Sequence, residues 1–169
     1  SPKKWLPFQK SFTLFHNKNT LVRDNLRFFT KPSIEPKPVV SAYGHESFYT
    51  TVQEQCQNLN IQSNSSGNKF DFLLVDLTDG QLDPDHLLKW VYRYGKKLKH
   101  RKFLWVLVPT DHINADEFPV AWELSNSISE FLTRKDEKII CLPNGRTWTS
   151  LYFRKDEHSK LVQTSANLV

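Results

Sequence analysis

The sequence predicts an α/β domain with a doubly wound sheet of five parallel strands and helices on both faces. Two runs, 70–75 and 103–108, are mostly apolar, as expected for strands that are covered on both sides. Amphipathic stretches with apolar residues at helical spacing follow the apolar runs in turn, which is typical of repeated βα units. The chain has 169 residues, of which 38% are hydrophobic, so one domain can bury a real core.

The first two βα units are expected in the N-terminal third of the chain. Residues 12–15 predict a strand, and Asn19 is the expected N-cap of the helix that follows. A stiff proline-rich connection leads to a second strand over residues 39–43. Apolar residues at helical spacing then predict a helix over residues 48–59.

The third and fourth units follow a polar loop over residues 60–68, which we expect to be flexible. A buried strand then ends on Asp76, and Asp83 with Pro84 is the expected N-cap and N1 pair of the next helix. The second apolar run supplies the fourth strand, which ends before Pro109.

The last unit is expected to be short. A helix starts near Pro119, and a strand over residues 138–142 leads through a turn to a last helix that begins at Trp148. The expected organisation is a linker over residues 1–10, the α/β domain over residues 11–158 and a polar tail over residues 159–169.

Composition limits the class of protein. The formal charge is +5, but acidic residues flank the basic cluster between Arg93 and Lys102, and no nucleic-acid-binding motif occurs, so nucleic acid is not the expected partner. The two cysteines, Cys56 and Cys141, form no disulfide or zinc framework, which favours a reducing cytoplasm. No segment is apolar over the roughly 18 residues of a membrane span. The absence of Met indicates a piece of a longer protein, whose membrane anchoring stays open.

Asp76 is the first candidate for chemistry. It stands at the expected carboxyl end of a buried strand, where open α/β sheets bind their ligands. The alternative is a local role, in which the carboxylate accepts backbone N–H groups of the following turn. An acid–base pair of Asp76 with His16 also stays open.

The succession of five βα units resembles the receiver domain of two-component signalling proteins. The motif from Asp71 to Asp76 stands where receivers have two acidic residues, the second of which accepts a phosphoryl group. Leu142 and Pro143 stand where receivers have Lys-Pro. The resemblance implies a receiver or flavodoxin-like sheet of strand order 2-1-3-4-5 over roughly residues 10 to 156.

The resemblance also implies that the phosphotransfer site is degenerate. Receivers hold Mg²⁺ with an acidic pair, but His16 and Asn17 stand at those positions, so we expect no metal and no cofactor. The receiver lysine is replaced by Leu142, and its Thr or Ser by Val108, with Thr110 close by. Asp76 is then a vestigial phosphoacceptor, since each lost donor typically costs about 3 kcal/mol of transition-state stabilisation.

Aromatic and basic side chains suggest a contact surface. Trp90 and Tyr94 lie off the expected buried stripe of their helix, and the last segment is rich in aromatic residues. The candidate interaction residues are Trp90, Arg93, Tyr94, Lys96, Lys97, Trp148, Tyr152 and Phe153.

The functional expectation is a non-catalytic pseudo-receiver of a larger signalling protein, such as a sensor histidine kinase, that acts through contacts with other domains or proteins. The domain itself is not expected to be an enzyme. Two alternatives stay open. One is a flavodoxin-like enzyme or small-ligand binder that uses the strand-end crevice, and the other is a basic nucleic-acid-binding domain. The oligomeric state does not follow from the sequence.

Overall fold

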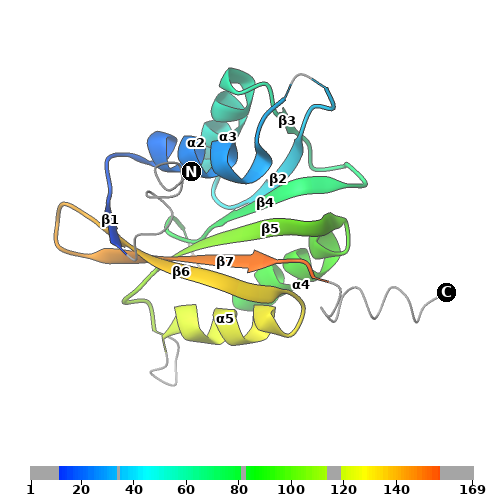
Figure 1. The fold of residues 1–169 in the computed structure, drawn as a ribbon. Helices are drawn as coiled ribbons and strands as arrows, with labels where there is room; N and C mark the ends of the chain where they lie inside the picture. Colours follow the sequence, from blue (N-terminus) through cyan, green and yellow to red (C-terminus); the bar gives the residue numbers. More distant parts are fainter. Residues whose placement is uncertain (1–11, 34, 81–82, 114–118, 157–169) are drawn as a thin grey trace.

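A seven-stranded mixed sheet forms the centre of the molecule (Figure 1). The structure is a computed structural model and describes residues 12–33, 35–80, 83–113 and 119–156. The elements are β1 Phe12–Leu14, α2 Lys18–Thr30, β2 Val39–Tyr43, α3 Glu46–Asn58, β3 Gln62–Ser63, β4 Phe70–Asp76, α4 Pro84–Gly95, β5 Leu98–Pro109, α5 Val120–Ser129, β6 Thr133–Cys141 and β7 Thr147–Arg154.

The strand order is β1-β6-β7-β5-β4-β2-β3. Strand β7 runs antiparallel to both of its neighbours, β5 and β6, and the other pairs are parallel. The expected sheet of five parallel strands in the order 2-1-3-4-5 is therefore wrong. The parallel strands still end at one edge of the sheet, where ligands of α/β proteins bind.

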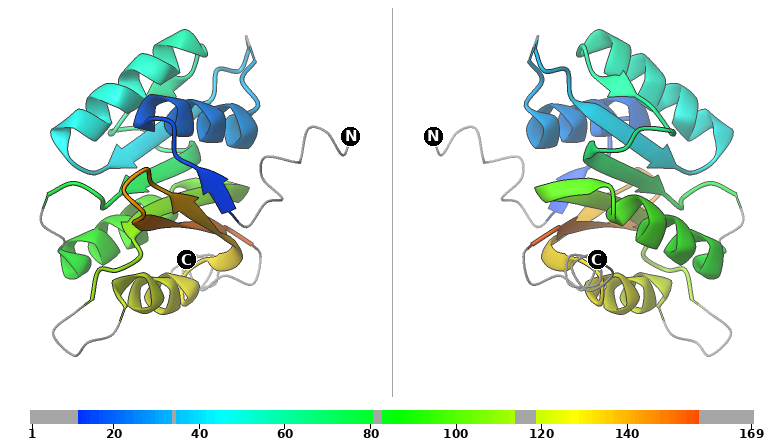
Figure 2. Two further views of the ribbon diagram at one scale, coloured as in Figure 1. Left: turned by 90° about the vertical axis from the view of Figure 1, so that its left-hand side faces the viewer. Right: turned by 90° about the vertical axis from the view of Figure 1, so that its right-hand side faces the viewer.

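Helices cover both faces of this sheet (Figure 2). Helices α2 and α3 pack on one face over a core that includes Phe72 and Trp105. Helices α4 and α5 pack on the other face over a core that includes Leu73 and Val106. Strands β4 and β5 are therefore buried on both sides, as their apolar sequences predicted.

Local sequence explains where the helices begin. The side chain of Asn17, rather than Asn19, caps α2 and accepts the N–H of Thr20 at 2.7 Å. Asp83 caps α4 and accepts the N–H of His86 at 3.1 Å, and Pro84 follows as the first helical residue. The predicted Asp83–Pro84 start is confirmed.

The last predicted helix is wrong, because residues 147–154 form β7. Trp148, Leu151 and Tyr152 have helical spacing in the sequence. In the structure, however, Tyr152 packs in the core under α2 and α3, while Leu151 and Phe153 pack in the core under α4 and α5. Successive residues thus alternate between two buried faces, which is the period of a strand. The sequence pattern could not distinguish a helix from a strand here, because both faces of β7 are apolar.

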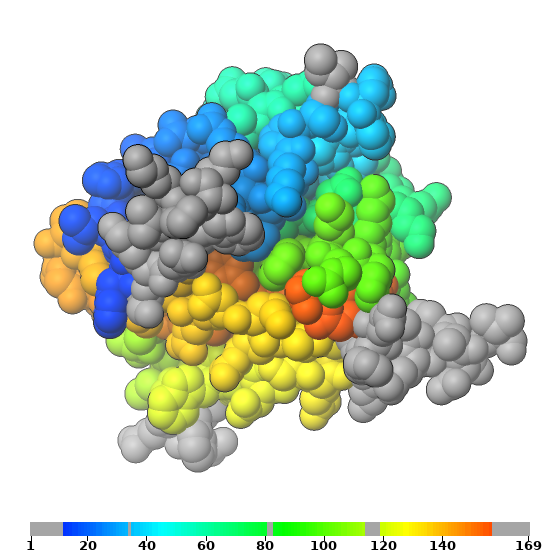
Figure 3. Space-filling view, viewed as in Figure 1, coloured from blue at the N-terminus to red at the C-terminus, as the bar shows by residue number. Residues whose placement is uncertain are grey.

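A tight turn joins β6 to β7. Gly145 has φ +85°, a conformation that favours glycine, and its N–H donates to the carbonyl of Leu142 at 3.1 Å. The end of β6 lies beside β1, and Leu14 is paired with Cys141. In Figure 3 these strands lie at the end of the molecule where orange and blue meet. Strand β1 is thus an edge strand next to β6 and lies away from β2.

Strand β5 begins earlier than expected, at Leu98, so part of the basic cluster lies on a strand. Arg101 has φ 65°, and its N–H donates to the carbonyl of Lys155 at 2.7 Å. The loop predicted over residues 60–68 contains the two-residue strand β3. The linker over residues 1–10 and the tail over residues 159–169 lie outside the described residues, so the domain boundaries stay predictions.

None of the helices in the described part of the chain is long and apolar enough to cross a membrane.

A buried hydrogen bond between β5 and β7 provides a test of the sheet order. Trp105 is fully buried, and its indole N–H donates to the hydroxyl of Ser150 at 2.6 Å. Changing Ser150 to Ala leaves the indole N–H without this acceptor, so we expect the free energy of unfolding to fall by about 1–3 kcal/mol. Urea denaturation measures the loss. The exposed Ser129→Ala variant is the control, and an unchanged stability of Ser150→Ala would contradict the pairing of β5 with β7.

Candidate functional site

The carboxyl ends of β2 and β4 form a topological switch point. The chain leaves β2 for α3 on one face of the sheet and leaves β4 for α4 on the other face. In open α/β sheets, ligands bind in the crevice at such a point. A cavity of about 180 Å³ lies here, which we call the strand-end crevice; its lining residues are Tyr43, Gly44, His45, Asp76, Leu77, Asp79, Gly80 and Asp83.

Asp76 is the buried charge of this crevice, at 1% exposure. One of its oxygens accepts the ammonium of Lys18 at 2.7 Å. The other accepts the N–H and the hydroxyl of Thr78, at 2.9 Å and 2.6 Å. The local role of Asp76 is thus present, since the carboxylate caps its own turn, and the same carboxylate also pairs with a lysine.

Lys18, at the first position of α2, contacts two carboxylates that line the crevice. Besides Asp76, its ammonium donates to the hydroxyl of Thr78 and to the carboxylate of Asp79, both at 2.8 Å. Burial disfavours the ammonium, but the charges of Asp76 and Asp79 and their hydrogen bonds outweigh it and raise the pKa of Lys18. Lys18 therefore carries its positive charge at neutral pH.

A glycine allows the ends of β2 and β4 to approach closely. A Cβ atom on Gly44 would lie 3.1 Å from the carbonyl oxygen of Asp76 and 2.9 Å from the ring of Phe48. Next to it, the hydroxyl of Tyr43 lies 2.8 Å from Nδ1 of His86, which ties β2 to the first turn of α4. Burial and the negative charge of Asp83 raise the pKa of Tyr43.

The structure does not bring the other predicted receiver positions together around Asp76. His16 is exposed, and no hydrogen bond joins it to Asp76 within the described residues. Asn17 acts as the helix cap, and Val108 is fully buried in β5. Leu142 lies at the β6–β7 turn, so β5 and β7 separate it from β4.

Thr110 follows β5 and shares a hydrogen bond with the hydroxyl of Thr149 at 2.8 Å. It is therefore engaged with β7.

The predicted interaction residues fall into three groups. Trp148 is half-buried beside Lys18, whose ammonium lies 5.1 Å from the ring centroid. Tyr152 and Phe153, in contrast, lie in the two cores at 3% and 0% exposure and offer no surface to a partner. The remaining five lie on or just after α4, namely Trp90, Arg93, Tyr94, Lys96 and Lys97.

Sequence reasoning missed Lys18 as a site residue, although a signal was present. A lysine in the first turn of a helix opposes the helix dipole, and the first turn of α2 contains no acidic residue to compensate. Such a lysine is stabilised when a carboxylate lies nearby, as Asp76 and Asp79 do here.

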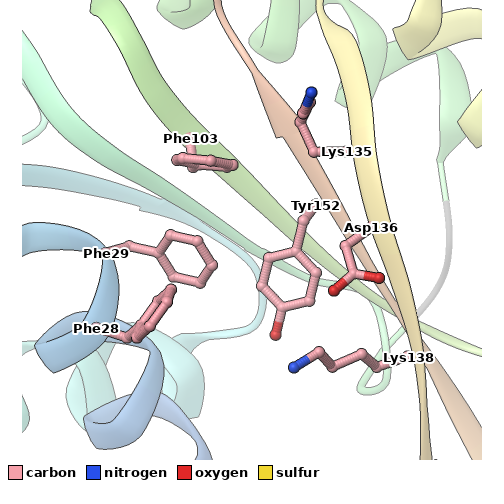
Figure 4. A pocket seen from close by; sticks show the side chains of 7 residues that line it. All are labelled: Phe28, Phe29, Phe103, Lys135, Asp136, Lys138 and Tyr152. Carbon is pink, nitrogen blue, oxygen red and sulfur yellow. The ribbon is translucent and has the colours of Figure 1, made fainter. Parts of the chain in front are cut away.

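A second cavity lies on the α2 face of the sheet, near the last turn of α2. Its volume is about 230 Å³, and its lining residues are Phe28, Phe29, Phe103, Lys135, Asp136, Lys138 and Tyr152 (Figure 4). Lys138 is 4% exposed, and burial lowers its pKa to about 8, against which the charge of Asp136 acts. None of these residues lines the strand-end crevice.

Among the described residues, no group of three or more His, Cys, Asp or Glu side chains has the arrangement of a metal site.

The fold is similar to that of methyltransferases of known structure. An N1-methyltransferase from Burkholderia thailandensis, solved with 1,6-didemethyltoxoflavin and S-adenosylhomocysteine, has a TM-score of 0.56 and 14% identity, covering 82% of this chain and 78% of that one. The N-methyltransferase NodS from Bradyrhizobium japonicum, solved with S-adenosylhomocysteine, has a TM-score of 0.52 and 14% identity, covering 82% and 85%.

A Listeria monocytogenes protein named as a class I S-adenosylmethionine-dependent methyltransferase has a TM-score of 0.51 and 12% identity. That match covers 83% of this chain and 59% of the Listeria protein. No protein-family model matches the chain. No curated protein sequence matches it either. At these identities, the structural matches establish the fold.

The expectation of a receiver-like domain is therefore wrong. The seven-stranded sheet with its antiparallel hairpin is the fold of class I S-adenosylmethionine-dependent methyltransferases. The expected non-catalytic pseudo-receiver, with its links to histidine kinases and phosphorelay, is overturned with it, because it depended on receiver positions that this fold does not contain. Neither the flavodoxin-like alternative nor the nucleic-acid-binding alternative fits the observed fold better.

The ion pair between Lys18 and Asp76 predicts a specific pattern of stabilities. Changing Lys18 to Met leaves the Asp76 carboxylate buried without its cation, so we expect the free energy of unfolding to fall by about 3 kcal/mol. The double variant Lys18→Met, Asp76→Asn removes both charges and should recover most of this loss. Urea denaturation of the three proteins measures the pattern.

The control for this series is Arg23→Met on the same helix. Arg23 pairs with Asp24 in solvent, with 43% of its side chain exposed, so its loss should cost about 0–1 kcal/mol. Equal losses for Arg23→Met and Lys18→Met would show that Lys18 is an ordinary surface lysine.

The buried Lys138 predicts a pH dependence of stability. In the folded protein the pKa of Lys138 is about 8, below the ordinary lysine value of 10.5, so the unfolded chain binds more protons between these two pH values. Stability should therefore rise with pH across this window because of Lys138. Changing Lys138 to Met should stabilise the protein at pH 7 and remove the rise. A parallel pH profile in Lys138→Met and the unchanged protein would contradict this assignment.

Proposed function

We propose that this domain is an S-adenosylmethionine-dependent methyltransferase that holds the charged part of its cofactor in the strand-end crevice. The observation that carries the proposal is the cluster of carboxylates at the switch point of a methyltransferase fold. Asp76, Asp79 and Asp83 all line the crevice, and Lys18 supplies a single opposing charge. Two proteins of similar fold have structures with bound S-adenosylhomocysteine, the product form of this cofactor.

The chemistry of the crevice fits the cofactor. S-adenosylmethionine carries a positively charged sulfonium and an ammonium group, which a net negative crevice favours. Gly44 brings the ends of β2 and β4 together at this crevice, because a Cβ atom there would meet Phe48 and the carbonyl oxygen of Asp76. The crevice volume of about 180 Å³ suits the charged end alone, since pockets for whole small molecules typically measure about 300–1,000 Å³.

When bound, the cofactor supplies an electrophilic methyl group. Lys18 is charged, so it does not take up the proton that an acceptor loses. Its three N–H groups donate to Asp76, Thr78 and Asp79, at 2.7 Å, 2.8 Å and 2.8 Å, so none is left for the acceptor. Lys18 therefore positions the carboxylates of Asp76 and Asp79 in the crevice.

Cofactor binding tests the proposal. We expect S-adenosylmethionine and S-adenosylhomocysteine to bind the unchanged protein in isothermal titration calorimetry. Changing Asp79 to Asn removes one carboxylate from the crevice rim and should weaken S-adenosylmethionine about tenfold or more, the usual effect of a charged hydrogen bond. S-adenosylhomocysteine has no sulfonium charge, so the Asp79→Asn change should weaken its binding less than that of S-adenosylmethionine.

Asp85→Asn is the matched control, because Asp85 is exposed in the first turn of α4 and does not line the crevice. The affinity of the Asp85→Asn variant for the cofactor should equal that of the unchanged protein. If neither compound binds at millimolar concentration, the proposed function is wrong.

We also propose a reducing cytoplasm as the setting. Both cysteines are free, and burial raises the pKa of the Cys56 thiol to about 12, which keeps it unreactive.

A further inference from the structure

The cavity near the last turn of α2 exists because strand β1 is short. Strand β1 has three residues and pairs with residues 139–141 of β6, whereas β6 begins at Thr133. The first six residues of β6 therefore extend beyond the strand that is described at its outer edge. Between them and the last turn of α2 lies the cavity of about 230 Å³ shown in Figure 4, which we call the α2-face pocket.

The α2-face pocket is separate from the strand-end crevice. Phe103 lines the pocket and is paired with Phe72 of β4, four residues before Asp76. A strand rises about 3.3 Å per residue, so this pair lies about 13 Å along β4 from the crevice. A ligand in the pocket therefore does not occupy the proposed cofactor site.

Strand β6 directs charged side chains into this pocket. Alternate residues of a strand share a face, so Asp136 and Lys138 lie on the same face as Ile140, which belongs to the core under α2 and α3. The pairing of β6 with β7 shifts register between Arg134 and Asp136, and the extra residue at this shift is Lys135. Lys135 also lines the pocket, and redirecting a side chain is a common effect of such a bulge.

Lys138 is a charged residue at a position that suits an apolar one. It is 4% exposed, and Ile140, the next residue on this face, is 2% exposed. Burial lowers the pKa of Lys138 to about 8, so the ammonium is destabilised there but is still mostly charged at pH 7. An apolar side chain of similar size is often more stable at such a position. Positions where a fold accepts a cost of this kind are typically functional.

Aromatic rings form the remaining walls of the pocket. The ring centroid of Phe29 lies 4.9 Å from that of Phe28, 4.9 Å from that of Phe103 and 5.1 Å from that of Tyr152. Figure 4 shows the three phenylalanine rings on one side of Tyr152 and the three β6 side chains on the other. The hydroxyl of Tyr152 donates to Asn25 at 2.8 Å, so its hydrogen is engaged. The pocket thus combines apolar rings with ammonium groups.

We propose that the α2-face pocket binds a single aromatic ring that carries a carboxylate. The ring gains from the aromatic walls, and the carboxylate gains from Lys135 and Lys138, whose two positive charges exceed the one negative charge of Asp136. The size agrees with this ligand. An apolar cavity of about 150 Å³ holds one benzene molecule. The pocket, at about 230 Å³, has room for one ring and a small substituent.

Benzoate is the probe, and isothermal titration calorimetry at pH 7 is the measurement. Benzyl alcohol has the ring without the charge, and acetate has the charge without the ring. We expect benzoate to bind about tenfold or more tightly than either, because a hydrogen bond to a charged group and the burial of a ring each contribute. The proposal is overturned if benzoate fails to bind at millimolar concentration, or if either comparison compound binds as tightly.

A lysine variant locates the carboxylate. Changing Lys138 to Met should weaken benzoate about tenfold or more and leave benzyl alcohol unchanged. Lys89→Met is the matched control, because Lys89 is exposed on α4 and does not line the pocket, so it should leave the affinity for benzoate unchanged. A folded Lys138→Met protein that binds benzoate as tightly as the unchanged protein would overturn the proposal.

A ring variant locates the aromatic group and decides the matter if Lys138→Met does not fold. Changing Phe28 to Ala removes one wall, so benzoate and benzyl alcohol should both bind more weakly. Arg27→Ala is the matched control, since Arg27 is exposed on the same helix and does not line the pocket. Equal affinities for benzoate in Phe28→Ala and Arg27→Ala would place the ring elsewhere and overturn the proposal.

S-adenosylhomocysteine distinguishes this pocket from the strand-end crevice. We expect benzoate and S-adenosylhomocysteine to bind at the same time, and mutual exclusion would assign benzoate to the crevice and overturn the proposal. Benzoate binding that Lys138→Met weakens, without any binding of S-adenosylhomocysteine, would support the α2-face pocket while removing the proposed function.

Discussion

The site depends on one interaction, the ion pair between Lys18 and Asp76. Asp76 is almost fully buried at the end of β4, and a buried carboxylate is stable only when its charge is compensated. Lys18 supplies this charge from the start of α2, 58 residues away in the chain. The contact therefore fixes the beginning of α2 beside the end of β4, where the strand-end crevice lies. Asp79, which also pairs with Lys18, and Asp83 line the same crevice.

Sequence reasoning predicted the elements better than their arrangement. Strand β4, the position of Asp76 at its end and the start of α4 at Asp83 all follow from local patterns of apolar run and helix cap. The helix predicted at Trp148 is wrong because β7 lies between β5 and β6 and is buried on both faces, which removes the polar–apolar alternation that identifies a strand. That error, together with the missed strand β3, converted a seven-stranded mixed sheet into a parallel one of five strands and led to the receiver comparison.

The same error explains the apparent degeneracy of the site. Leu142 looked like a lost lysine because the receiver order 2-1-3-4-5 places only one strand between the Leu142 strand and the Asp76 strand. Strands β5 and β7 in fact separate them. The residue that does place an ammonium on Asp76 is Lys18, which no local pattern pairs with it. Long-range contacts of this kind depend on topology, so they become visible only once the strand order is known.

Two described cavities differ in electrostatic character, and this difference bears on specificity. The strand-end crevice is lined by three aspartates, Asp76, Asp79 and Asp83. The cavity near the last turn of α2 is lined by aromatic side chains together with Lys135, Asp136 and Lys138, so its charged groups sum to a positive charge. A cationic ligand is therefore favoured in the crevice and disfavoured in the second cavity. Selectivity for a cation can thus arise from the placement of charge at the ends of β2 and β4.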